Sequence, residues 1–159
     1  HDLVAKLIKE YQRTADASYK ADLRAAVTST IDKAEVNSIV DKFEDADVIK
    51  PQDLRGWYRG LLANHHGQQA AWDWIREDWD WLDKTVGGDM EFATFITVTT
   101  GVFHTPERLK EFKEFFEPKV NIPLLSREIK MDIKVIEGKV NLIEDEKDAV
   151  NSAVAKAID

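Results

Sequence analysis

The 159-residue sequence contains no cysteine. Disulfide bonds, thiolate metal sites and cysteine nucleophiles are therefore excluded. Stability has to come from a buried core, and a chain of this length can bury roughly 70% of the surface that its unfolded form exposes. With 43% hydrophobic and 33% charged residues, the composition is that of a soluble globular protein. We expect one domain over residues 1–159.

Positive charge is scarce as well. The 22 Lys and Arg residues are outnumbered by 30 Asp and Glu, which gives a net charge of −8. Nucleic acids and anionic membranes both require a cationic surface, so neither is an expected partner. The longest stretch without a formal charge, 92–106, is shorter than the roughly 20 apolar residues that span a bilayer. The first residues also lack the basic and apolar blocks of a secretory signal.

Glycine and proline are few, with 7 and 4 residues, and most of them stand where a helix would begin or end. Between them, apolar residues recur every three or four positions, which is typical of helices that bury one face. Asp32 and Thr105 are residue types that cap helix N-termini. The expected helices cover residues 2–13, 23–31, 36–43, 51–62, 68–86, 92–102, 106–116, 124–145 and 146–158.

About nine helices with short connections predict an all-α protein. Neighbouring helices would pair as antiparallel hairpins at a spacing of roughly 30–45 residues, which favours an α-α superhelix, a solenoid of the HEAT kind. The segment 92–102 is the exception to a simple helical pattern, because its β-branched residues favour a strand. No second strand is available to pair with it, so we expect a helix here too.

The stretch 68–86 has the clearest helical stripe. Its main apolar face steps by three and four residues along the chain. Trp74 and Trp81 lie on a neighbouring stripe, which predicts that this helix is covered on more than one side. The residues of the main face are Trp72, Ile75, Trp79, Leu82 and Val86.

Residues for catalysis are missing from the pattern. His65 and His66 do not begin a His-Glu-x-x-His motif, so they predict a polar turn rather than a zinc site. No Gly-x-Ser-x-Gly elbow and no glycine-rich phosphate loop is present. The carboxylates beside the tryptophan stripe, Glu77, Asp78, Asp80 and Asp83, indicate a solvated face. We therefore predict no catalytic, cofactor-binding or metal-ligating residue in this chain.

Three segments, in this order, resemble one family. Residues 69–82, QAAWDWIREDWDWL, with Gly87 and Gly88 after them, resemble the Ala-Trp-x-Phe-(Val/Ile)-(Lys/Arg)-Glu-(Asn/Asp)-Trp-Asp-x-Leu signature of the C-terminal helical domain of aminopeptidase N-type zinc metallopeptidases. Here Trp74 stands where phenylalanine is usual, and Asp78 where asparagine is common. Residues 109–116 and 21–30 resemble the helices that follow and precede that signature, the latter in lactic-acid-bacterial members.

The resemblance implies a non-catalytic C-terminal domain of a larger, cytoplasmic aminopeptidase that removes N-terminal amino acids from peptides. In that family the zinc and the Gly-x-Met-Glu-Asn motif belong to an upstream catalytic domain. The implied partners are that domain and the peptide substrate in the chamber that the helical domain closes over, with limited access for peptides. Residues 88–92, GDMEF, imitate the motif, but Phe92 replaces its asparagine. The alternative function is a free-standing helical-repeat scaffold for protein–protein interaction.

Overall fold

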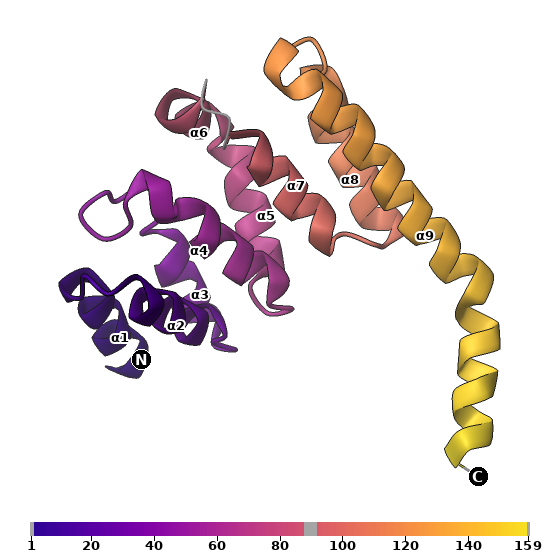
Figure 1. Ribbon diagram of the computed structural model, residues 1–159, viewed down its shortest axis with the longest axis horizontal. Helices are drawn as coiled ribbons and strands as arrows, with labels where there is room; N and C mark the ends of the chain where they lie inside the picture. The colour runs from indigo at the N-terminus through magenta and orange to yellow at the C-terminus, as the bar shows by residue number, and fades with distance from the viewer. Residues whose placement is uncertain (1, 88–91, 159) are drawn as a thin grey trace. The chain divides into compact units, whose positions relative to one another are not determined.

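The computed structural model describes residues 2–87 and 92–158, and over these ranges it is built from helices joined by short turns. The prediction of an all-α protein is confirmed. Figure 1 shows the course of the helices. Their bounds are α1 (Asp2–Arg13), α2 (Ala17–Thr28), α3 (Lys33–Val40), α4 (Pro51–Ala63), α5 (Gln68–Glu77), α6 (Trp79–Val86), α7 (Phe92–Val102), α8 (Pro106–Phe116), the 3₁₀ turn η1 (Glu117–Lys119) and α9 (Pro123–Ile158).

The chain divides into two compact units, His1–Phe95 and Ile96–Asp159, with the division inside α7. Each unit has its own packing. The assignment of the chain to one helical-repeat domain, and the superhelical arrangement of the helix pairs, stay predictions.

Helix α4 lies at the centre of the first unit. It packs between α2 and α5, while α2 also contacts α1, and α5 also contacts α3. Five of its side chains, Leu54, Trp57, Tyr58, Leu61 and Leu62, are completely buried. Gly60 permits the close approach of α2, because a Cβ atom at this position would lie 2.4 Å from Oγ1 of Thr28.

Both predicted N-caps are confirmed. Oδ1 of Asp32 accepts hydrogen bonds from the backbone N–H groups of Ala34 and Glu35, at 2.8 and 3.0 Å. Oγ1 of Thr105 accepts one from Arg108 N at 3.2 Å. Each cap satisfies donors that the first turn of a helix leaves unpaired.

The single helix expected over 68–86 is wrong in one respect, because the structure divides it at Asp78 into α5 and α6. Asp78 leaves the helical region, with φ −105° and ψ 24°. The two indoles on either side of this bend pack against different neighbours. Trp74 packs on Phe43 with 4.9 Å between ring centroids, and Trp79 packs on Phe92 at 5.0 Å. A straight helix with a single apolar stripe has no reason to bend, so the pattern alone did not reveal this break.

Helix α7 confirms the helical interpretation of 92–102 against local β propensity. Its burial explains the outcome, since Phe95, Ile96 and Thr99 are all buried. The hydroxyl of Thr100 donates to the carbonyl of Ile96, one turn earlier, at 3.0 Å. Tertiary packing outweighs the modest propensity cost of β-branched residues in a helix.

In the second unit, α8 packs along the first half of α9. Phe112 and Phe116 of α8 are fully buried, as are Leu125 and Ile129 of α9. The ammonium group of Lys113 pairs with Glu137 Oε1 at 2.6 Å. The two helices expected over 124–145 and 146–158 are instead one helix of 36 residues. No proline interrupts the sequence between them, so backbone hydrogen bonding continues through the expected boundary.

Replacing Trp79 by alanine is expected to lower the free energy of unfolding by about 3–5 kcal/mol, because its buried ring leaves a cavity beside Phe92. Trp81→Ala, on the same helix, removes an equal volume from a partly exposed site and should cost less. Chemical denaturation of both variants checks the order. A larger loss for Trp81→Ala would mean that the buried face of α6 is assigned wrongly.

Candidate functional site

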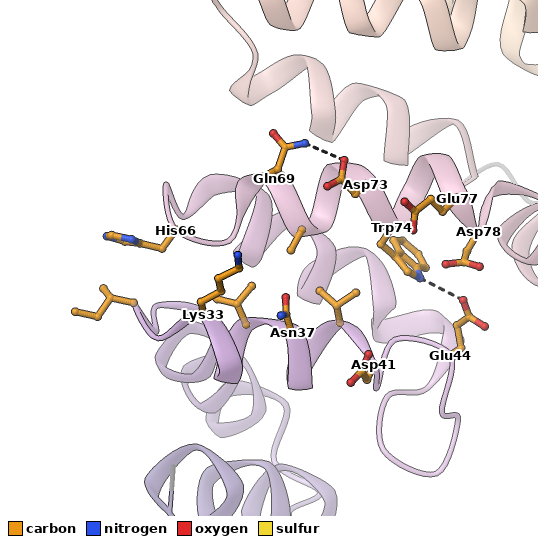
Figure 2. A pocket seen from close by; sticks show the side chains of 14 residues that line it. Lys33, Asn37, Asp41, Glu44, His66, Gln69, Asp73, Trp74, Glu77 and Asp78 are labelled. Atoms are coloured by element: carbon orange, nitrogen blue, oxygen red, sulfur yellow. Dashed lines mark hydrogen bonds between the residues drawn. The ribbon is translucent and has the colours of Figure 1, made fainter.

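A groove of about 1060 Å³ lies between α3 and α5 in the first unit. Figure 2 shows its lining side chains, which come from α3 and α5 and from the turns beside them. The lining is rich in carboxylates: Asp41, Glu44, Asp73, Glu77 and Asp78. Lys33 is the lysine among its lining residues. An excess of carboxylates around one groove favours cationic groups, such as lysine and arginine side chains, over anionic ones.

Trp74 connects the groove to the core. Its indole is 4% exposed, and one edge of it reaches the groove. The Nε1 group donates a hydrogen bond to Oε1 of Glu44 at 3.3 Å, as the dashed line in Figure 2 indicates. The ring also packs on Phe43 and Tyr58. The position of Glu44 is thus tied to a side chain that the core holds in place.

The remaining carboxylates differ in how they are held. Arg76 donates to Oδ1 of Asp73 at 2.5 Å, and Gln69 donates to the same oxygen at 2.8 Å. Glu77 is exposed, as are Asp80 and Asp83 outside the groove. The predicted solvated face is therefore correct for these three residues. Of the five carboxylates that line the groove, Glu44 and Asp73 are thus held by hydrogen bonds.

The predicted polar turn at His65 and His66 is confirmed. Both histidines are exposed, between α4 and α5. The residue that organises the turn is Asn64, whose Nδ2 group donates to the carbonyl oxygens of Thr28 and Thr30 at 2.9 and 2.7 Å. Its Oδ1 atom accepts from His66 N at 3.0 Å. The sequence analysis missed Asn64, since an asparagine in a turn does not reveal a long-range partner.

A second polar cluster lies in the second unit, where α7 and α9 meet. Asp132 of α9 is 3% exposed, and its Oδ2 atom has no hydrogen-bond partner in the described residues. The pKa of Asp132 is raised to about 6, mainly by burial and next by the charge of Glu128, one turn earlier. Thr100 and Lys139 act in the opposite direction. The Lys139 ammonium donates to the carbonyl oxygen of Thr100 at 2.6 Å.

The sequence analysis also missed Asp132, although the pattern contained a signal. Asp132 lies three residues after Ile129 and four before Ile136, on the buried face of a helix. A charged residue in such a position is rare without a specific environment.

The described ranges, 2–87 and 92–158, contain no group of three His, Cys, Asp or Glu side chains arranged to hold a metal ion. The first four residues of the imitation motif, 88–91, lie outside the described residues, and only Phe92 is placed, at the start of α7. None of the described helices is long and apolar enough to cross a membrane.

These features can be set beside known proteins. The ERAP1-like C-terminal domain family matches residues 1–138. The chain belongs to this family, which agrees with its all-α fold and with the tryptophan signature on α5 and α6.

Similar curated proteins carry the name Aminopeptidase N. The chain is 84% identical to that of Lactobacillus helveticus over 158 residues, which are 99% of the chain and 19% of the relative. It is 55% identical to that of Lactobacillus delbrueckii subsp. lactis over 157 residues, with the same coverage of both proteins. The identity to the Lactococcus lactis subsp. lactis protein is 38% over 152 residues, which are 96% of the chain and 18% of the relative. The chain thus spans about a fifth of the length of these relatives.

The buried carboxyl of Asp132 predicts a pH-dependent stability. In the unfolded chain an aspartate has a pKa near 3.9, below the value of about 6 in the folded chain. The folded state therefore binds the proton more tightly, which favours folding fully below pH 4. This contribution is lost as the pH rises through 6. At pH 7 the ionised carboxyl should cost about 1–3 kcal/mol.

Asp132→Asn, which is neutral throughout, is expected to raise the free energy of unfolding at pH 7 and to weaken its fall between pH 4 and 7. All five tryptophans belong to the first unit, so far-ultraviolet circular dichroism is the appropriate measurement for the second. Asp145→Asn, at an exposed position of the same helix, is the control. Its free energy of unfolding should depend on pH in the same way as that of the original chain. Equal profiles for all three proteins would contradict the assignment.

Proposed function

We propose that this chain is the non-catalytic C-terminal domain of a zinc-dependent aminopeptidase that removes N-terminal amino acids from peptides. The observation that carries the proposal is the pair of alignments that cover 99% of the chain with proteins named Aminopeptidase N, at 84% and 55% identity. Because the chain spans 19% of each relative, most of such a protein lies outside it. The proposal places the catalytic residues and the zinc ligands in that other part.

The proposed role of the domain is to close over the active site and to limit the access of peptides. Its partners would then be the catalytic domain and the peptide substrate. The acidic groove between α3 and α5 supports a role in contact with cationic groups, because five carboxylates line it. Two of them, Glu44 and Asp73, are held in place by hydrogen bonds from Trp74, Arg76 and Gln69. The proposed cytoplasmic location rests on the resemblance to lactic-acid-bacterial enzymes alone.

The isolated chain is expected to hydrolyse no aminoacyl anilide and to bind no stoichiometric zinc, since catalytic zinc needs three protein ligands at fixed spacing. Purified chain would be assayed before and after chelation, with metal content measured by mass spectrometry. Activity that survives purification and disappears on chelation would show that the chain carries its own catalytic site.

Limited access predicts a change of selectivity in the longer polypeptide. Removing this domain is expected to raise kcat/KM for a long peptide relative to an aminoacyl anilide, because the anilide is small enough to enter a closed chamber. Adding the separate domain should restore the original ratio. A ratio that is the same with and without the domain would contradict the role in peptide access, and leave the scaffold function as the better explanation.

A further inference from the structure

Helix α9 carries one apolar stripe along its whole length, with steps of four and three residues. Such a pattern brings its members to one face of a helix and is typical of a helix that packs along a partner. Lys147 interrupts the stripe once, and Ala157 ends it with a small side chain. The members of the stripe are Ile129, Ile133, Ile136, Val140, Ile143, Lys147, Val150, Val154 and Ala157.

Only the first part of this stripe has a partner in the described chain. Ile129, Ile136 and Val140 are buried, and α8 packs against this part of α9. Beyond Val140 every described residue is exposed. Figure 1 shows α9, in orange and yellow, continuing well past the end of α8. The face that α8 covers in the first half of the helix is therefore open in the second half.

The open half is strongly apolar for a solvent-facing helix. Five large apolar side chains between 142 and 158 are each 45% to 80% exposed: Leu142, Ile143, Val150, Val154 and Ile158. Three of them, Ile143, Val150 and Val154, form a seam that keeps the spacing of the buried half and that Lys147 interrupts once. Large apolar side chains that are exposed on one face of a helix mark a site of association in soluble proteins.

The open half of α9 is also present in longer relatives. The family match ends at residue 138, two positions before burial ends at Val140. The alignment with the Lactobacillus helveticus protein nevertheless covers 158 of the 159 residues at 84% identity. The open half of α9 is thus a shared part of aminopeptidase relatives that are about five times as long as this chain, and most of their length lies outside it.

We propose that the face formed by Ile143, Val150 and Val154 of α9 is a docking surface for the remainder of the same aminopeptidase polypeptide. This inference rests on the proposed function. The occupant is an apolar surface with a basic rim, because Glu144 and Glu146 flank the seam and the segment 142–158 contains four acidic and two basic residues. Docking would bury the second half of α9 in the same way that α8 buries the first half.

Hydrogen exchange of the amides of 142–158 tests the proposal. In the isolated chain a projecting helix without tertiary contacts opens readily, so its amides should exchange quickly. In the longer polypeptide the same amides should exchange at least roughly 100-fold more slowly, because docking must be broken before they open. Unchanged fast exchange in the longer polypeptide would overturn the proposal.

Two variants of the longer polypeptide locate the surface. Val150→Asp together with Val154→Asp places two charges on the seam and should abolish the protection. Ser152→Asp with Ala155→Asp adds the same charge on the opposite side of the helix and should leave it intact. Equal loss of protection in both variants would mean that the seam is not the contact.

Two further outcomes separate this inference from others. Protection in the isolated chain that increases with concentration would assign the face to a second copy of the chain, and would overturn the proposal. Fast exchange of 142–158 in a longer polypeptide whose peptide selectivity still depends on the domain would reject the docking surface but keep the proposed function. Protected amides in a polypeptide without aminopeptidase activity would reject the proposed function alone.

Discussion

The burial of α4 is the constraint on which the first unit depends. This helix has α2 on one side and α5 on another, and its tryptophan and tyrosine side chains are completely enclosed. Gly60 allows the backbone of α4 to approach Thr28 closely, while Trp57 meets the ring of Tyr11 edge-on, with 4.9 Å between centroids. Helices α1, α2 and α5 are therefore positioned by one central element, and a change in α4 would alter all three contacts.

The acidic groove follows from this arrangement, because one face of α5 packs into the core and another lines the groove. Trp72 and Ile75 are completely buried, and Trp74 extends toward the turn after α3, where it donates a hydrogen bond to Glu44. The carboxylates of α5 and of the turn after α3 then line the same groove. Their excess over basic residues makes the groove acidic, which favours cationic groups over anionic ones.

The sequence revealed individual helices far better than relations between them. Periodicity predicted the buried face of α5 and α6, since a helix repeats its environment every three to four residues, and residue type predicted the caps at Asp32 and Thr105. The break at Asp78 and the continuity of α9 were missed, because both depend on packing and on the absence of a breaker rather than on periodicity. The groove could not be predicted at all. It forms between Asp41 and Asp73, which come from separate helices, and no local pattern records that these two helices meet.

Asp132 and the open half of α9 show two different limits on what the sequence pattern of a helix can predict. At Asp132 the residue type conflicts with its place on a buried stripe, so the sequence itself marks the position as unusual. Beyond Val140 the apolar register continues in the same spacing, with Lys147 as its one charged member. The spacing of the apolar residues indicates that this face of the helix packs against a partner. It does not indicate whether the same chain supplies that partner. In the first half α8 is that partner. In the second half the apolar face of α9 continues beyond the part that α8 covers and is exposed in the described chain, and it is this face that the proposed docking would bury.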